Sequence, residues 1–176
     1  MVNGYRLMVI GLLGLLTACG GQQGPQRPSR WMGHTPEPDS TQLQLLEFNQ
    51  RMATEADTEL LRYVEAQPES YALYKAGVWV HIITPGNDEE PYMYGQECSL
   101  QMRIYALGKG QRLLSDQQGT FRMSGDQLPI AVMEMVRELS PGTHAQLVAP
   151  WYSAYGVTGN DHVPPYQNVL IDLTIE

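Results

Sequence analysis

The fold is decided by residues 149–165, APWYSAYGVTGNDHVPP, and by the run VLIDLTI at residues 169–175. Gly156 and Gly159 give the first segment access to backbone conformations that other residues avoid, and the two prolines at its end stiffen it. The second segment is rich in aliphatic and β-branched residues, which favours a strand. Together the two segments predict a shaped loop that leads into the closing strand of a sheet.

The composition fits a globular protein. The chain has 176 residues, of which 43% are hydrophobic, so it is long enough for one domain with accessory segments and can bury a core. Its formal net charge is -8, and its lysines and arginines form no cluster. Because binding to a nucleic-acid backbone depends on clustered positive charge, the composition argues against nucleic acid as a partner.

Residues 1–18 have the pattern of an export signal. Arg6 supplies a positive charge, residues 7–16 form a short apolar segment, and the sequence LTAC occupies residues 16–19. The apolar segment is too short to span a bilayer comfortably. LTAC resembles the lipobox of bacterial lipoproteins, which implies that Cys19 is acylated and becomes the first residue of the mature chain. An ordinary secretory signal with a chance cysteine is the alternative.

Residues 19–40 are rich in Gly, Pro and Gln, which predicts an extended, flexible tether between the anchor and the folded part. The lipid on Cys19 would make the membrane a partner of the chain. Gly20 is not an acidic retention signal. The expected location is therefore the bacterial cell envelope, with the protein anchored in the outer membrane and facing the periplasm.

Residues 41–72 are predicted to form a helical extension. Apolar residues recur there at spacings of three and four, which indicates one apolar helical face: Leu45, Phe48, Met52, Ala56, Leu60 and Val64. Pro68 is expected to end the run, and periodicity leaves open whether a break near residues 53–55 divides it into two helices. The apolar face can pack on the chain's own domain or mediate dimerisation.

Residues 73–176 are predicted to form an α+β domain. Alternation, β-branched residues and turn signals indicate strands at residues 77–84, at 98–107, from 113–114 onward, and at 120–123, 144–148 and 169–175. One short helix is expected at residues 130–139, where Ser-Pro-Gly ends the apolar pattern. The expected architecture is a twisted antiparallel sheet of four to five strands wrapped on that helix, with a pocket where helix and sheet diverge.

Cysteine and histidine usage indicates no metal site. Cys98 alternates with apolar residues, which favours a buried small side chain over a reactive thiol. The four histidines show no helical i,i+4 pairing and have no cysteine nearby, so they do not match a zinc site. The acidic residues 88–90 are expected to form a solvated loop.

Five motifs carry a resemblance to a known family. They are ELSPG at residues 138–142, QLVAP at 146–150, AYGVTG at 154–159, VPP at 163–165 and VLIDL at 169–173. In this order and spacing they resemble the FKBP-type peptidyl-prolyl cis-trans isomerases. The similarity is close from Met133 to Glu176 and looser from Val78 onward. With its lipobox, tether and leading helix, the chain is also similar to FKBP-type lipoproteins of Bacteroidetes, including those associated with gliding motility.

The resemblance implies three catalytic residues. Tyr155 matches the loop tyrosine whose hydroxyl points at a substrate carbonyl, although a structural tyrosine bonded to backbone is the alternative. Val163 matches an apolar residue of the loop that overhangs the pocket. Ile171 occupies the place of a pocket phenylalanine on the last strand.

The resemblance also implies a substrate pocket, and here the chain departs from the family. The matching positions are Phe121, Leu128, Pro129, Val132 and Leu113. Leu113 stands where the family has the phenylalanine of a Phe-Asp pair, and Val132 is a small substitute for a tryptophan. Pro129 has no N–H to donate to a ligand carbonyl, unless the register shifts by one residue.

The implied activity needs no cofactor. Rotation about an X-Pro bond faces a barrier of about 20 kcal/mol, and a dry pocket with a few donors lowers it without a nucleophile or metal. The expected function is a membrane-anchored isomerase that acts on Pro-containing polypeptides and assists the folding of exported proteins. The alternative is a catalytically weak FKBP-like chaperone or binding module attached to an envelope assembly.

Overall fold

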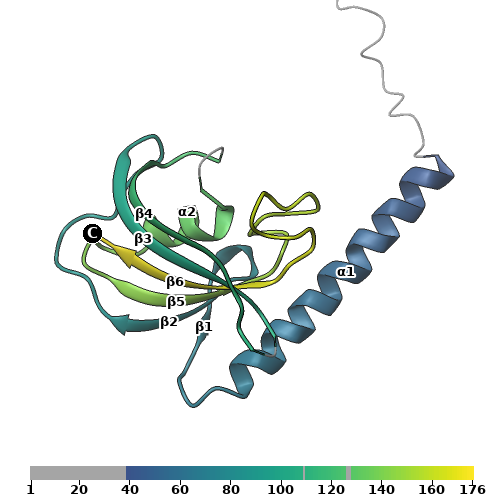
Figure 1. Ribbon diagram of the computed structural model, residues 1–176, viewed down its shortest axis with the longest axis horizontal. Helices are drawn as coiled ribbons and strands as arrows, with labels where there is room; N and C mark the ends of the chain where they lie inside the picture. The colour runs from purple at the N-terminus through teal and green to yellow at the C-terminus, as the bar shows by residue number, and fades with distance from the viewer. Residues whose placement is uncertain (1–38, 109, 126–127) are drawn as a thin grey trace, which may run out of the picture. The chain divides into compact units, whose positions relative to one another are not determined.

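The computed structural model describes residues 39–108, 110–125 and 128–176. The expected signal peptide, Cys19 and nearly all of the tether lie outside these residues. In chain order the elements are α1 (Ser40–Glu65), β1 (Ala72–Leu73), η2 (Lys75–Gly77), β2 (Trp79–Thr84), β3 (Glu97–Ala106), β4 (Leu113–Arg122), α2 (Ile130–Val136), β5 (His144–Ala149) and β6 (Val169–Ile175) (Figure 1).

Helix α1 begins with a capping box and runs without a break. Asp39 accepts a bond from the Gln42 N–H at 2.8 Å, and the Gln42 side chain accepts one from the Asp39 N–H at 3.2 Å. Thr54 lies in the segment where the sequence left a break open. Its hydroxyl donates to the Gln50 carbonyl at 3.0 Å, so this polar residue is accommodated within one continuous helix. The 26-residue helix ends at Glu65, three residues before Pro68.

The sheet confirms the expected α+β fold. Among the described residues it has six antiparallel strands in the order β1-β2-β5-β6-β3-β4. The strand beyond the expected number is β1, a two-residue strand that pairs with Trp79 and Val80. Residues 113–114 and 120–123, expected as separate strands, belong to the single ten-residue strand β4 and its end. Gly119, near the end of β4, pairs with Leu100 and does not interrupt the ladder.

One face of the sheet packs on α2 and forms the main core. Alternating residues of β3 and β6 point into it, as the sequence pattern predicts: Cys98, Leu100, Met102, Ile104, Val169, Ile171, Leu173 and Ile175. Ala131, Val132, Met135 and Val136 supply the buried face of α2. The free thiol of Cys98 lies in this core, where burial raises its pKa.

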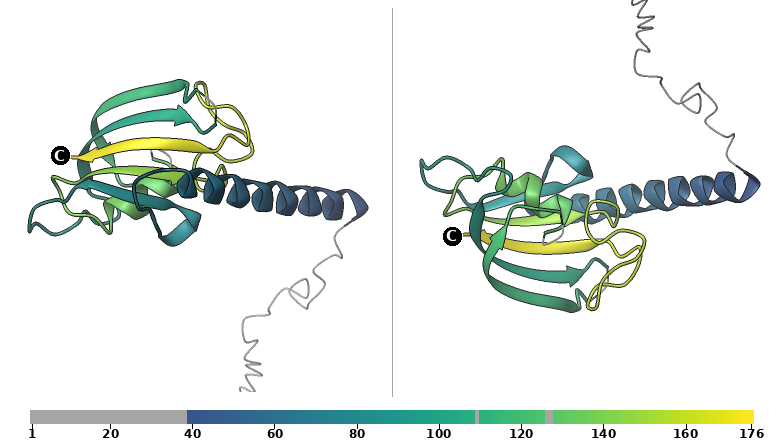
Figure 2. Two further views of the ribbon diagram at one scale, coloured as in Figure 1. Left: turned by 90° about the horizontal axis from the view of Figure 1, so that it is seen from below. Right: turned by 90° about the horizontal axis from the view of Figure 1, so that it is seen from above.

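The opposite face of the sheet is partly covered by α1. Leu60 and Val64 pack there against Leu107, Val148 and Leu170. The N-terminal part of the helix extends past the sheet (Figures 1 and 2). There the apolar stripe is no longer buried, and Leu45 is 57% exposed. The C-terminal half of the stripe therefore packs on the sheet, whereas the N-terminal turns do not.

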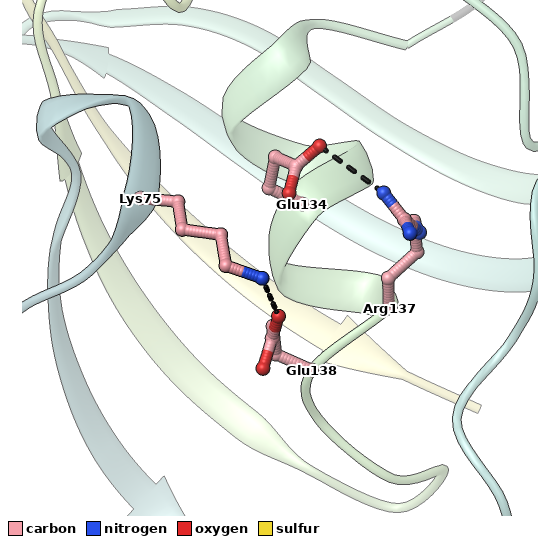
Figure 3. Close-up of polar contacts among 4 residues, drawn as sticks. All are labelled: Lys75, Glu134, Arg137 and Glu138. Atoms are coloured by element: carbon pink, nitrogen blue, oxygen red, sulfur yellow. Dashed lines mark hydrogen bonds and ion pairs between the residues drawn. The ribbon is translucent and has the colours of Figure 1, made fainter.

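The one-turn helix η2 lies beside α2. Lys75 reaches Glu138 just after α2, with 2.5 Å between Nζ and Oε1, while Arg137 pairs with Glu134 within the same segment at 3.3 Å (Figure 3). The Glu138 carboxylate raises the pKa of Lys75, and the lysine lowers the pKa of Glu138. Because these groups are exposed, water screens the pair and its contribution to stability is small.

Candidate active site on the loop between β5 and β6

The loop between β5 and β6 starts with a tight, hydrogen-bonded turn. The Pro150 carbonyl accepts bonds from the Ser153 and Ala154 N–H groups, both at 3.1 Å. The Gly156 N–H donates to the Trp151 carbonyl at 2.8 Å, and Gly156 has a φ of 70°, in the left-handed region that suits glycine. This turn fixes the backbone on both sides of Tyr155.

Gly159 allows the second half of the loop to close on itself. Its φ is 65°, and a Cβ at this position would lie 2.2 Å from the Val163 carbonyl oxygen. Asn160 completes the closure, because its side-chain oxygen accepts bonds from the His162 and Val163 N–H groups at 2.9 and 2.7 Å. The result is a compact turn that holds the Val163 side chain in the main core.

Tyr155 is the polar group that this loop presents. Its ring packs against the main core, and burial raises the pKa of its hydroxyl to about 12. Within the described part of the chain, the hydroxyl has no hydrogen-bond partner, and no buried side-chain oxygen or nitrogen is left unpaired. The hydroxyl therefore reaches solvent and stays protonated at neutral pH. The structure gives it no bond to backbone, so it is free to donate to a ligand.

Four of the other predicted site residues lie together in the main core. Val132 on α2 and Ile171 on β6 are fully buried, as is Val163, and Leu128 is nearly so. Phe121, at the end of β4, is half-buried and packs against the same core. Tyr155 and Phe121 are thus two aromatic rings at the margin of an apolar cluster to which α2, β6 and the loop all contribute.

Leu113 does not join this cluster. It is 49% exposed and pairs with Tyr105, whose ring packs on the α1 side of the sheet. Its neighbour Leu114 packs against the main core instead. The cause is a register shift in the β3–β4 ladder between Ile104 and Tyr105, which places an additional residue in β4 and reverses the alternation.

Pro129 precedes α2 and leaves one backbone donor beside it. The Pro129 carbonyl accepts bonds from the Val132 and Met133 N–H groups at 3.0 and 3.1 Å. The next donor in the chain is the N–H of Ile130, the first residue of α2, for which no acceptor is found among the described residues. The first N–H groups of a helix have no partner within it, so Ile130 is a donor that the sequence comparison with the family did not single out.

Strand β4 presents a largely polar surface to the core side of the sheet. Its residues opposite the core-facing positions of β3 are Phe121, Gly119, Gln117 and Ser115. The Gln117 side-chain amide donates to the Ser115 hydroxyl at 2.9 Å. Phe121 is therefore the only ring that β4 contributes to this side of the sheet.

A metal site and a membrane-spanning helix each place requirements on the described residues. No three His, Cys, Asp or Glu side chains in residues 39–108, 110–125 and 128–176 come together as a metal site would require. No described helix has the length and apolar character needed to cross a bilayer.

Comparison with known proteins supports the same architecture. No protein-family model matches the sequence, and no curated protein matches it. A peptidyl-prolyl cis-trans isomerase from Pseudomonas syringae pv. tomato is 18% identical, with a TM-score of 0.58 over 71% of this chain and 92% of that one. FkpA from Escherichia coli gives the same identity and TM-score over 79% of this chain and 72% of its own. The N-terminal domain of FKBP42 from Arabidopsis thaliana is 22% identical, with a TM-score of 0.51 over 62% and 91%.

The domain has the FKBP fold. In this FKBP-fold domain, the loop that carries Tyr155 and Val163 connects the two central strands β5 and β6, and α2 lies against the core-facing side of the sheet. The identities are too low to carry a function across, so any activity has to be argued from the side chains themselves.

Proposed function

We propose that this protein is a peptidyl-prolyl cis-trans isomerase that acts on Pro-containing segments of other polypeptides. The observation that carries the proposal is the Tyr155 hydroxyl, a protonated donor without an internal partner that lies at the margin of an apolar cluster in an FKBP-fold domain. Such a hydroxyl suits recognition of a carbonyl, because it loses no internal hydrogen bond when it donates.

The proposed mechanism is conformational and needs no covalent step. As an X-Pro bond twists, its amide loses resonance and becomes less polar, so an apolar surface favours the twisted form over the planar one. Phe121 and the Tyr155 ring, which are only partly buried, would form that surface. Val163 and Ile171 lie fully buried in the core that supports it, and the Tyr155 hydroxyl would hold a neighbouring carbonyl. The Ile130 N–H is the backbone donor available in place of the one that Pro129 lacks.

A second candidate function is favoured by the site residues that depart from the family's pattern. Val132 is small, Pro129 supplies no donor, and β4 presents Ser115, Gln117 and Gly119 to the core side of the sheet. A site with fewer rings and a polar wall holds a prolyl ring less tightly and suits slower turnover. On this alternative, the domain binds unfolded or Pro-containing segments as a chaperone or docks on an envelope assembly.

Exchange NMR on a short peptide with one Leu-Pro bond tests the activity. The full chain is expected to produce cis-trans exchange cross-peaks that the peptide alone does not show on the same timescale, because uncatalysed isomerisation takes about 10–100 s. A rate equal to that of buffer would refute the isomerase. Suppressed aggregation of an unfolded client by a chain without catalytic activity would then establish the chaperone alternative.

We further propose that the chain is a bacterial envelope lipoprotein of the kind found in Bacteroidetes, attached through Cys19 and facing the periplasm. The lipobox-like LTAC at residues 16–19 supports this proposal. Treatment with globomycin is expected to accumulate a larger precursor in the membrane fraction, and a palmitate analogue is expected to label the mature chain. An unchanged size together with no label would contradict the lipid anchor.

A further inference from the structure

We propose that α1 is a positioning element of the active site, because side chains of this helix hold the loop that carries Tyr155. The inference rests on the proposed isomerase function, since it assigns α1 a part in that activity. It also makes a separate statement about the stiffness of residues 150–168, which can be tested without any activity.

Two tyrosine hydroxyls of the loop donate to α1. The Tyr152 hydroxyl lies 2.6 Å from the Asp57 side-chain oxygen, and the Tyr166 hydroxyl lies 3.0 Å from the Asn49 side-chain oxygen. Tyr152 comes three residues before Tyr155, within the turn that the Gly156 N–H closes. The hydrogen bond to Asp57 therefore acts on the same turn of backbone that presents Tyr155.

Asn168 ties both ends of the loop to one point on α1. It is only 6% exposed, and its side-chain oxygen accepts a bond from the Trp151 N–H at 2.9 Å. Its side-chain amide donates to the Glu59 carboxylate at 2.6 Å. In addition, the Trp151 indole N–H donates to the Met52 carbonyl at 3.3 Å. Asn168 thus connects Trp151, at the start of the loop, and the end of the loop to Glu59 of the helix.

Aromatic rings fill the space between these hydrogen bonds. Trp151 packs edge-on against Tyr166 with 4.8 Å between ring centroids and against Tyr152 with 5.6 Å. Phe48 of α1 completes the row with an edge-on contact to Tyr166 at 5.8 Å. Such pairs add to the energy of simple burial, so the loop and the helix are joined by packing as well as by polar contacts.

The arrangement is specific to the loop and is separate from the docking of α1 on the sheet. Leu60 and Val64 attach the helix to the sheet through apolar contacts with Val148 and Leu170. The loop contacts lie further toward the N-terminus of α1, and two of their acceptors are carboxylates, which make stronger hydrogen bonds than neutral groups do. Burial and then Asp57 raise the pKa of Tyr152, which keeps its hydroxyl a donor.

Loops between strands move more than the strands do, and catalysis depends on a group being within about 1 Å of its place. A loop that is bound to a helix meets this requirement, because its backbone is already ordered before the substrate binds. The prediction is that loosening the helix contacts lowers kcat while the sheet keeps its stability.

The test compares two sets of tyrosine hydroxyls in the full chain. Tyr152→Phe combined with Tyr166→Phe removes both loop-to-helix hydroxyl bonds and keeps the rings. Tyr71→Phe is the matched control, because its hydroxyl also makes one side-chain bond, to Gln146 at 2.8 Å, but on the sheet and away from the loop. The double variant is expected to lower kcat about tenfold with little change in KM, and the control to stay within about twofold of wild type.

Hydrogen exchange gives the readout that does not depend on activity. The backbone donors to follow are the N–H groups of Gly156, Gly159 and Tyr166, each of which makes a bond within the loop. The double variant is expected to raise their exchange rates and to leave the amides of β5 and β6 unchanged.

Asp57 supplies the rescue experiment. Asp57→Ala is expected to reproduce the effect of Tyr152→Phe, and the two changes together are expected to be no worse than either alone. Asp57→Asn keeps an acceptor oxygen and is expected to recover most of the rate.

Unchanged loop exchange in the double variant would overturn the positioning role, whatever its activity. Equal loss of protection in the loop and in the sheet would also overturn it, because the bonds would then serve global stability. A wild-type chain without isomerase activity would refute the proposed function, whereas the exchange data would still decide whether α1 orders the loop.

Discussion

Removing the Tyr155 hydroxyl is expected to change the catalytic rate without changing the stability of the fold. Tyr155→Phe removes one oxygen atom and keeps the ring that packs against the main core. Because the hydroxyl has no hydrogen-bond partner in the described part of the chain, its removal leaves no other group unpaired. The variant is therefore expected to unfold within about 1 °C of wild type, since a 1 kcal/mol change would move the midpoint by several degrees.

The catalytic effect follows from the bond that the hydroxyl would make in the transition state. A neutral hydrogen bond contributes about 0.5–1.5 kcal/mol net, which corresponds to a rate ratio of about 2 to 12. Exchange NMR on a Leu-Pro peptide measures kcat/KM for both proteins at equal concentration. The expected outcome is a variant that is slower by a factor in this range and has the same thermal midpoint.

The pH dependence gives a second check on the same residue. Burial raises the pKa of Tyr155 from 10.0 to about 12, so the folded protein keeps this proton through the ordinary alkaline range. Because the pKa of Tyr155 is higher in the folded than in the unfolded state, its proton contributes fully to the free energy of unfolding below about pH 10. This contribution is lost as the pH rises toward 12. Wild-type kcat/KM is therefore expected to show no loss through Tyr155 ionisation between neutral pH and about pH 10.

Two results would refute this reasoning. If Tyr155→Phe turned over as fast as wild type, the hydroxyl would not be the carbonyl donor. If the variant lost several degrees of thermal stability, the hydroxyl would have an internal partner and the structural explanation of Tyr155 would apply.

Two further predictions concern the elements around the site. Leu60→Ala, at a fully buried position of α1, is expected to lower the free energy of unfolding in urea by about 2–5 kcal/mol. Leu61→Ala, at a half-exposed neighbouring position, is expected to change it by less than about 0.5 kcal/mol. Equal effects would contradict the packing of α1 on the sheet. Gly159→Ala is expected to destabilise the chain more than Gly156→Ala. Both residues have a positive φ, but only at Gly159 would a Cβ clash with the Val163 carbonyl. The midpoints of thermal unfolding of the two variants test this order.

The sheet could be predicted from the sequence because its strands carry a pattern of period two. Side chains of β3 and β6 alternate between the two faces of the sheet, and Gly95 and Gly108 flank β3. β1 has no such pattern, since Ala72 and Leu73 are both exposed and become a strand only by pairing with β2. A two-residue strand depends on its neighbour and leaves no periodic signal.

The site could be predicted only in part. The backbone freedom of Gly156 and Gly159 predicted the shaped loop, whereas the role of Val163 came only from the family resemblance. The position of Leu113 could not be predicted, because the shift in the β3–β4 ladder is a property of pairing between two strands. Asp57 could not be connected with Tyr152 either, since they are 95 residues apart and nothing in the sequence around either residue points to the other.

The buried thiol of Cys98 gives the molecule its own unfolding reporter. Cys98 is 1% exposed, lies opposite Phe121 across the β3–β4 pair, and has a raised pKa. A thiol reacts as the thiolate, so a labelling reagent can modify this residue only when the edge of the sheet opens. The labelling rate in native buffer therefore measures how often β4 detaches beneath the proposed site, and a bound proline peptide that contacts Phe121 would slow it.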